Sequence, residues 1–407
     1  MNILLTDAGK CDTVFPIPPV RGHREYRAPK VIPSDDRDLP GRPWPGTLGQ
    51  EGDFVNPKLR FAKNMIKSRI TGQKIPLTVG WEITQRCNLT CSYCDVWAKK
   101  SEDLSTEQVK EIVAGLAELG AYSISFDGGE PLMRKDMGEI IDHVRAHGIA
   151  ARIHSNGVLF PKRIKEIRNL SSVKFSLDGP RELNDAVRGE GVYDGVIRAV
   201  EVAHEHHIPV GLTAVISNAN VAHVMEMAEL ARQIKAPVTF QPCSNQVDAD
   251  TPENQHHGSP DVLLYREAVR RLIAAKKSNP YIANSLAGLK HILQWPNPTW
   301  IPCYAGQMFV TINHKGKLYS CSRLDRNRLP VIDITRLGIR KALEELPLAG
   351  GCAHCWCARR AESNLLFHMH PAPLFGKYLY GPDDPPVLPM PETLPAPSGQ
   401  KPLPLVT

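Results

Sequence analysis

The sequence predicts an α/β protein: a partial (β/α)6 TIM-type barrel followed by a small C-terminal hairpin-plus-helix module. Between residues 77 and 241, apolar segments of strand length alternate with longer segments whose apolar residues recur at helical spacing. Such alternation is typical of a parallel sheet covered by helices on its outside. A second observation is that potential cofactor ligands follow several of the predicted strands, where active sites of such barrels lie.

The predicted strands are short and rich in β-branched or apolar residues, and they span residues 77–84, 122–127, 150–154, 173–177, 210–216 and 238–241. Helices fill the intervals. The first of them begins with a capping box of Ser105 and Gln108 ahead of an apolar face. Six β/α units are fewer than a complete barrel needs, so we expect incomplete closure.

Proline content and cysteine positions divide the rest of the chain. We expect an irregular Pro-rich arm with a basic amphipathic helix (1–76), the barrel core (77–245), linking helices (246–298), a cysteine-bearing module (299–366) and a Pro-rich tail (367–407). The arm and tail carry too many prolines for continuous helices or central strands.

Composition restricts the class of protein. The 407 residues are 42% hydrophobic and 23% charged, as in ordinary globular proteins. No apolar run approaches the about 20 residues of a membrane span, and the first ten residues do not resemble a signal peptide. We therefore expect a cytoplasmic location. The net charge of +6 is modest and spread along the chain, so we expect no nucleic-acid partner.

The segment 56–74 is basic and has no acidic residue. Phe61, Met65, Ile66 and Ile70 fall near helical spacing within it. One interpretation is a helix that makes peripheral contact with an anionic membrane. The other is a helix that packs its apolar stripe against the barrel, and the sequence leaves both open.

Cys87, Cys91 and Cys94 form a Cys-x3-Cys-x2-Cys motif directly after the first predicted strand. Three thiolates on one short loop can hold three irons of a 4Fe–4S cube and leave the fourth iron open. An open iron is what a chemically active cluster requires. A zinc site is the alternative for such a cysteine group.

Around these cysteines, residues 77–241 resemble the radical S-adenosylmethionine (SAM) superfamily. Gly128, Gly129, Glu130 and Pro131 follow the second strand and are similar to the family's GGEP element. The resemblance implies that this element presents backbone groups to the amine of SAM, with glycines that permit close approach. It also implies that the amine and carboxylate of SAM chelate the open iron.

Other positions match the same family. Tyr93 matches an aromatic position near adenine, and Ser155 with Asn156 follows the third strand where Thr-Asn is frequent. Ser176 ends the fourth strand at a position that commonly contacts the ribose or carboxylate of SAM. Arg188 matches an arginine that can bind that carboxylate. Residues 213–218 are expected to offer a platform for adenine.

The resemblance implies a radical reaction. One electron, from a donor such as flavodoxin or ferredoxin, reduces the cluster, and SAM is cleaved to methionine and a 5′-deoxyadenosyl radical. That radical abstracts hydrogen from an unactivated carbon. The cofactors supply the reactivity, while the protein supplies positioning and exclusion of water.

A second cysteine group lies near the C-terminus. Cys303 and Cys321 flank a predicted hairpin, Cys352 and Cys355 follow a short helix, and Cys357 is a fifth candidate. Four thiolates close the coordination of zinc or of a second 4Fe–4S cluster. The group resembles the twitch module, a short form of the SPASM extension, which implies an auxiliary cluster acting as electron conduit. Whether Cys355 or Cys357 completes that cluster stays open.

The substrate is less determined than the cofactors. The main hypothesis is a small molecule, such as a sugar, cyclitol or lipid-like compound. The alternative is a maturase of a ribosomally synthesised peptide, ranked second because the N-terminal arm does not resemble a winged-helix peptide-binding domain. A third hypothesis, a two-cluster electron carrier, does not explain the GGEP element. Gln241, Cys243 and Tyr304 are candidate substrate-side residues, and Cys243 is a candidate hydrogen-atom donor.

Overall fold

A computed structural model describes residues 57–92, 94, 96–98, 102–244, 258–297, 299, 301–321, 330–349 and 355–368. By its internal contacts the chain divides into residues 1–48 and 49–407, and every described residue belongs to the second unit. The predicted arm and most of the predicted tail lie outside the described residues. No helix in the described ranges is long and apolar enough to cross a membrane.

The central sheet contains the six predicted strands in parallel. They are β1 (Thr78–Thr84), β2 (Ser123–Gly128), β3 (Ala150–Ser155), β4 (Ser172–Ser176), β5 (Val210–Ile216) and β6 (Val238–Pro242). The full order across the sheet is β6-β5-β4-β3-β2-β1-β7-β8-β9. Sequential parallel neighbours joined by helices are the arrangement of a partial barrel, so the predicted fold class is confirmed.

Helices cover one side of this sheet. They are α2 (Thr106–Glu118), α3 (Met137–Ala146), α4 (Phe160–Arg163), α5 (Arg181–Arg188), α6 (Val192–Glu205) and α7 (Val224–Gln233), with short 3-10 turns η1 (Val96–Ala98), η2 (Pro131–Met133) and η3 (Val221–His223). The predicted capping box of α2 forms in full. Strand residues that face these helices, such as Val79, Trp81 and Ile83, are buried in the main core.

The inner face of the sheet is the side away from these helices. Side chains alternate along a strand, so residues paired in register on neighbouring strands share a face. Gly80 is paired with Ser125 and Ser125 with Arg152, and His154 is paired with Lys174. Interior parallel sheets usually carry apolar side chains on both faces. The polar inner face therefore marks the functional side of the barrel.

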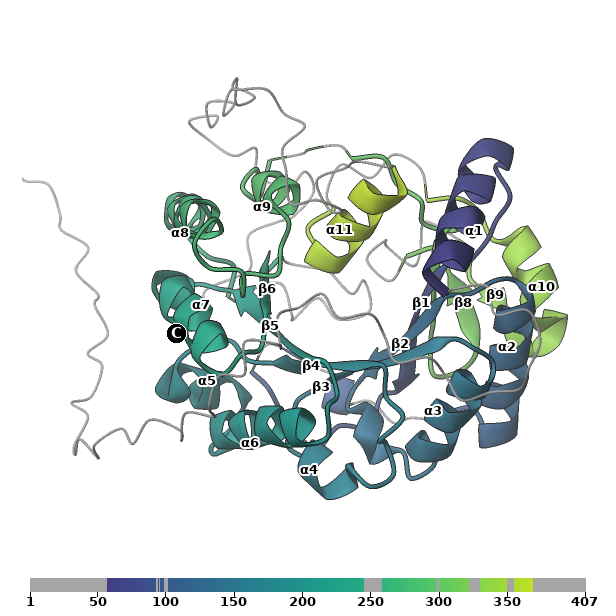
Figure 1. The fold of residues 1–407 in the computed structure, drawn as a ribbon, viewed down its shortest axis with the longest axis horizontal. Coiled ribbons are helices and arrows are strands. Elements are labelled where there is room, and N and C mark those ends of the chain that lie inside the picture. The colour runs from purple at the N-terminus through teal and green to yellow at the C-terminus, as the bar shows by residue number, and fades with distance from the viewer. Residues whose placement is uncertain are drawn as a thin grey trace, which may run out of the picture. The chain divides into compact units, whose positions relative to one another are not determined.

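The C-terminal module extends the same sheet. Its elements are β7 (Phe309–Ile312), β8 (Lys317–Tyr319), β9 (Ile332–Asp333), α10 (Ile334–Glu345) and α11 (Ala358–Phe367). Strand β7 pairs in parallel with β1 and antiparallel with β8, which confirms the predicted hairpin. Figure 1 shows α11 on the side of the sheet opposite α2 to α7.

Three further helices lie beside the barrel. The linking segment contains α8 (Val262–Ala275) and α9 (Leu286–Ile292), and the basic segment forms α1 (Pro57–Thr71). On α1, Phe61 and Met65 pack against a second core cluster, whereas Ile66 and Ile70 are exposed. The expectation of a single apolar stripe is wrong, because these residues fall on two faces of the helix.

Candidate active site

The loop after β1 holds the three cysteines of the first motif. Burial raises the pKa of the Cys87 and Cys91 thiols, and the charge of each nearby thiol raises it further. The thiols are therefore close enough to influence one another, and a shared cationic partner would favour their thiolate forms. The backbone N–H of Cys94 donates to the carbonyl of Cys91 at 3.0 Å, which closes the loop. Tyr93 lies outside the described residues.

Backbone contacts tie the GGEP segment to this loop. The N–H of Gly129 donates to the carbonyl of Thr84, and that of Glu130 to the carbonyl of Arg86, both at 2.8 Å. Gly128 has a φ of +122°, and a Cβ there would lie 2.2 Å from the Thr84 oxygen. A Cβ on Gly129 would lie 2.2 Å from the Arg86 oxygen. Both glycines are needed for this close backbone approach, before any ligand is considered.

Glu130 joins the ends of β2 and β3. Its fully buried carboxylate accepts hydrogen bonds from the Ser155 hydroxyl at 3.0 Å and from the Asn156 N–H at 2.8 Å. Asn156 in turn donates through its side chain to Asn88 of the cysteine loop at 2.9 Å. Burial raises the pKa of Glu130 to about 7, against the lowering effect of these hydrogen bonds. Pro131 begins η2 directly after it.

Arg188 forms a buried ion pair that sequence reasoning missed. Its Nη2 lies 2.7 Å and its Nε 2.9 Å from the Asp178 carboxylate, and both side chains are nearly inaccessible. Asp178 also accepts from the N–H of Val215 on β5 at 3.0 Å. The Arg188 charge acts to lower the pKa of the Cys91 thiol, although burial outweighs it. Asp178 therefore holds Arg188 beside the cysteine loop.

A pocket of about 280 Å³ lies next to this ion pair at the carboxyl ends of β4 and β5. Its lining residues are Ser92, Asp178, Leu183, Val187, Val215, Ser217, Asn218, Ala219, Asn220, Cys243 and Gly258. Ser92 belongs to the cysteine loop and donates its N–H to the carbonyl of Val187 at 2.9 Å. The pocket thus joins the cysteine loop to the predicted adenine platform at residues 213–218. Apolar walls with a polar rim suit a heteroaromatic ring.

Two further predicted residues, Ser176 and Tyr304, do not line this pocket. Ser176 ends β4 in register with Thr213. Tyr304 packs in the second core cluster with Met65 and accepts a hydrogen bond from Arg69 at 2.5 Å, so it belongs to the interface with α1. A substrate-side role for Tyr304 is not supported by this position.

The cysteines of the second group surround the start of α11. Cys321 and Cys357 both influence the pKa of Arg360. Asn364 contacts the Cys355 sulfur at 3.9 Å and accepts from the N–H of Tyr304, next to Cys303, at 3.0 Å. Cys352 lies outside the described residues. Four of the five candidate ligands are therefore gathered around one helix.

Within the described ranges, no group of three or more His, Cys, Asp or Glu side chains is placed to hold a single metal ion. A 4Fe–4S cube has a different requirement, because each thiolate binds its own iron and the cysteines surround a volume. The three-cysteine loop, the close GGEP backbone and the adjacent pocket fit a cluster with SAM beside it.

Comparison with known proteins identifies the family of the barrel domain. Residues 81–231 match the family described as the radical SAM superfamily. Residues 81–231 therefore form a radical SAM domain, the domain of enzymes that work with a 4Fe–4S cluster and SAM. The similarity to some relatives extends beyond this domain toward the C-terminal cysteines.

Two relatives represent different chemistries. The chain is 41% identical over 172 residues to Fe-coproporphyrin III synthase of Methanosarcina barkeri, covering 40% of this chain and 43% of the relative. It is 28% identical over 309 residues to the mycofactocin maturase MftC of Mycolicibacterium smegmatis, covering 70% of this chain and 76% of that protein. The first similarity is closer but spans less than half of either protein.

Solved structures support the fold. SuiB of Streptococcus suis, solved with S-adenosylmethionine, matches with a TM-score of 0.57 at 15% identity, covering 75% of this chain and 74% of that chain. SuiB has also been solved with its precursor peptide SuiA. At this identity the likeness shows the architecture alone.

Proposed function

We propose that the protein is a radical SAM maturase that modifies a peptide, the hypothesis that the sequence alone ranked second. The supporting observation is the extent of the similarity to MftC. The radical SAM match ends at residue 231, whereas the MftC alignment covers 70% of the chain, so it includes residues outside the cofactor-binding domain. A similarity of this extent concerns more of the enzyme than its cofactor-binding domain.

In this proposal the chain's own residues hold the cofactors. Cys87, Cys91 and Cys94 would bind three irons, and the pocket beside Ser92 would take the adenine of SAM. When bound, the reduced cluster and SAM supply the radical that abstracts hydrogen. Buried Glu130 accepts hydrogen bonds from Leu132, Ser155 and Asn156 and so holds the GGEP segment, whose backbone groups would meet the amine of SAM. Arg188, oriented by Asp178, would present its guanidinium to the carboxylate of SAM.

We also propose that Cys303, Cys321 and two of the three later cysteines hold an auxiliary 4Fe–4S cluster that conducts an electron from the substrate radical. The convergence of Cys321 and Cys357 near Arg360 supports this assignment. A cationic side chain near a thiolate cluster stabilises its negative charge and raises its reduction potential. A structural zinc would hold the module together without that role.

A second candidate function is modification of a tetrapyrrole. The 41% identity to Fe-coproporphyrin III synthase favours it. That alignment covers 40% of this chain, no more than a radical SAM domain requires, so it weighs less on the substrate than the longer MftC alignment. Both candidates use the same cofactors and differ in the molecule that enters the barrel.

Peripheral membrane contact through α1 remains a proposal of lower rank. Leu59, Ile66 and Ile70 of α1 are 62%, 43% and 79% exposed, and exposed Lys63 and Lys67 lie among them. An apolar stripe flanked by lysines suits an anionic lipid surface. Co-sedimentation with phosphatidylglycerol vesicles, reduced in an Ile66→Ser/Ile70→Ser variant, would support this contact. Equal sedimentation of both proteins would reject it. The flavodoxin- or ferredoxin-like donor and the cytoplasmic location also stay predictions.

The test of the main proposal begins with anaerobic reconstitution of the full chain with iron and sulfide. The protein is then given SAM, dithionite and either short peptides encoded near its gene or an iron coproporphyrin. We expect 5′-deoxyadenosine formation to increase with one peptide, together with a change in that peptide's mass. A modified tetrapyrrole with unchanged peptides would replace the main proposal by the second candidate. Replacement of Cys87, Cys91 and Cys94 by alanine should abolish 5′-deoxyadenosine in either case.

A further inference from the structure

A group of cationic side chains lies on the inner face of the barrel, apart from the cofactor residues. Arg152 on β3 and Lys174 on β4 face inward by their register, and α11 adds Arg359 and Arg360. These cations act on one another and on His154 of the same face, whose pKa is lowered well below its usual value by burial and by their charge. Residues distant in sequence thus gather several positive charges in one place.

Glycines in two strands make room for these side chains. A Cβ on Gly80 of β1 would lie 3.2 Å from the Arg360 guanidinium and 3.3 Å from that of Arg359. Gly211 of β5 leaves space for the Lys174 stem, which would lie 3.7 Å from a Cβ there. Lys174 passes over Gly211 to donate to Thr239 on β6 at 2.9 Å. Glycine inside a strand often marks such a close approach.

Among the carboxylates near this face, Asp127 lies beside Arg359, and the charge of Glu362 of α11 acts on Lys174 although no salt bridge joins them in the described part of the chain. Asp127 lies 3.4 Å from Arg359, and Glu362 accepts a hydrogen bond from the N–H of Ser285 at 2.8 Å. Glu82 also faces inward from β1, paired in register with Asp127. Arg360 donates to Thr311 at 2.8 Å and lies over the Phe309 ring at 4.3 Å. Arg360 and Arg359 therefore have partners in the protein.

Arg152 and Lys174 differ from that pair. In the described part of the chain Arg152 has no hydrogen bond or ion pair, and Lys174 has only the neutral Thr239 hydroxyl as hydrogen-bond partner. Burial is the main cause that lowers the pKa of both, yet the Arg152 side chain is exposed to water. Arg152 is thus closely surrounded by the protein while its side chain stays accessible to water. Charges left unpaired there are unfavourable unless a ligand compensates them.

The auxiliary cluster does not account for Arg152. The thiols of Cys321 and Cys357 act on Arg360, and Cys357 also acts on Lys174. The groups whose charge influences Arg152 are Tyr122 and Arg359, and no thiol is among them. A negative cluster explains the cations nearest α11 and leaves the β3 arginine without a partner.

We propose that Arg152 and Lys174 bind a carboxylate of the substrate on the inner face of the barrel. The planar guanidinium suits a carboxylate through two parallel hydrogen bonds, and the ammonium adds a point charge. This inference rests on the proposed function, because it deepens the substrate class: a peptide with a free C-terminal or side-chain carboxylate. A tetrapyrrole bears the same chemical group, so the experiment separates the two sources.

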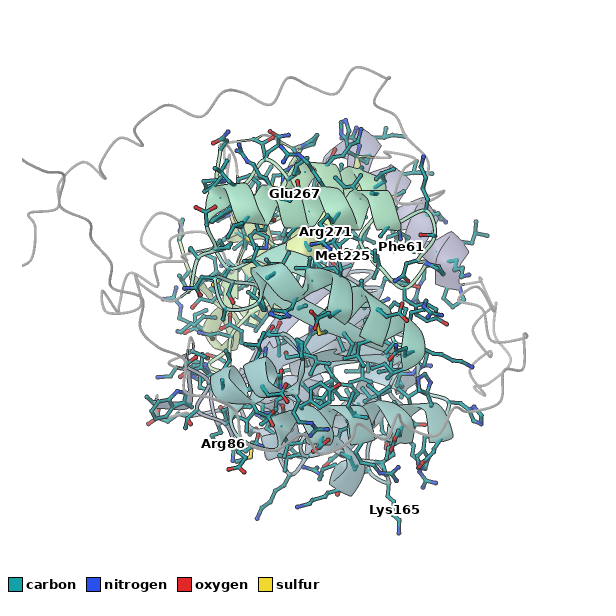
Figure 2. All side chains as sticks on the ribbon, turned by 90° about the vertical axis from the view of Figure 1, so that its left-hand side faces the viewer. Phe61, Arg86, Lys165, Met225, Glu267 and Arg271 are labelled. Carbon is teal, nitrogen blue, oxygen red and sulfur yellow. The ribbon has the colours of Figure 1, made fainter. Side chains whose placement is uncertain are left out.

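The experiment uses the reconstituted full chain with SAM saturating its own site. Glutarate is the carboxylate probe and glutaramide the neutral control, at constant ionic strength, with affinity measured from the shift in Tm. The test variant is Arg152→Gln/Lys174→Gln. The control is Lys165→Gln/Arg168→Gln on the outer surface, where Figure 2 shows Lys165 pointing away from the protein.

We expect the test variant to weaken glutarate binding at least about tenfold, as for loss of charge-assisted hydrogen bonds, and the control to change it less than about twofold. Arg152→Lys should restore part of the affinity because it keeps the charge. Iron content and 5′-deoxyadenosine formation without substrate confirm that the variants are folded and loaded. Equal glutarate affinity in all three proteins would overturn the proposal.

Two further arms identify the source of the carboxylate. One compares a peptide with a free C-terminus, a C-terminally amidated peptide with one glutamate, and the amidated peptide with glutamine in its place. The other uses coproporphyrin III, a tetracarboxylate. Dependence on Arg152 and Lys174 for a peptide supports the inference and the maturase together. The same dependence for coproporphyrin alone keeps the carboxylate site and rejects the peptide.

Discussion

Two charged regions of this barrel differ in whether their charges are balanced by partners within the protein. At the rim, where the strands end, Asp178 neutralises Arg188 and three donors satisfy Glu130. On the inner face, neither Arg152 nor Lys174 forms a salt bridge among the described residues, although the charge of Glu362 acts on Lys174. The rim charges hold the loops in place, whereas the inner charges remain available to a ligand. Removing a rim charge should therefore destabilise the fold, and removing an inner charge should stabilise it.

The largest effect is expected from Asp178→Ala, because it leaves Arg188 buried without its partner. We expect a loss of about 3–5 kcal/mol in the free energy of unfolding, as for other broken buried pairs. Denaturant unfolding measures it. The double variant Asp178→Ala/Arg188→Met removes the unpaired charge as well and should recover part of the loss. A loss below about 1 kcal/mol in the single variant would contradict a structural role for the pair.

Gly129→Ala should have the next largest effect. Its Cβ would lie 2.2 Å from a backbone oxygen, so the GGEP segment must move away from the cysteine loop. We expect a destabilisation of about 2–3 kcal/mol together with reduced iron content after reconstitution. Gly191→Ala is the matched control, because Gly191 has a φ of +77° and open space around it. It should show only the backbone strain of about 1–2 kcal/mol with normal iron content.

Lys174→Met tests the inner face. Its folded pKa of about 8 lies below the usual 10.5, so the protonated side chain opposes folding near neutral pH. We expect the variant to be more stable than wild type by about 1–2 kcal/mol at pH 7, less than the full pKa shift implies because water reaches this face.

The difference in stability between Lys174→Met and wild type should depend on pH. Between pH 8 and 10.5 the unfolded state binds more protons at this lysine than the folded state, so wild-type stability rises with pH relative to the variant. The advantage of Lys174→Met should therefore decline from pH 8 to pH 10. Lys165→Met on the outer surface should stay within about 0.5 kcal/mol of wild type throughout. A constant difference across this range would show that Lys174 is not perturbed.

The smallest effect is expected from Cys243→Ala. Cys243 lines the pocket that we assign to adenine, where a hydrogen-atom donor would not meet a substrate radical. We expect 5′-deoxyadenosine formation and product yield to change less than about twofold. A product that incorporates no solvent-derived hydrogen in the variant, but does in wild type, would restore the hypothesis that Cys243 is the donor.

Much of the fold followed from local patterns. The six strands, the α2 capping box and the hairpin between Cys303 and Cys321 were predicted because periodicity, caps and turns are short-range properties. The basic segment was predicted correctly as a helix, but its apolar residues lie on two faces. Which face of α1 is buried depends on Tyr304 and Phe367, far along the chain.

The sequence by itself determined the cofactor chemistry, because three cysteines on one short loop and the GGEP segment are contiguous motifs whose function depends on local spacing. Only the tertiary structure decided which distant residues meet. It paired Arg188 with Asp178, joined β7 to β1, and placed α11 over the inner face where Arg152 and Lys174 lie. Such contacts are set by strand register and helix packing, which bring together side chains that no local pattern relates. A ligand on that inner face could therefore not have been predicted from the sequence alone.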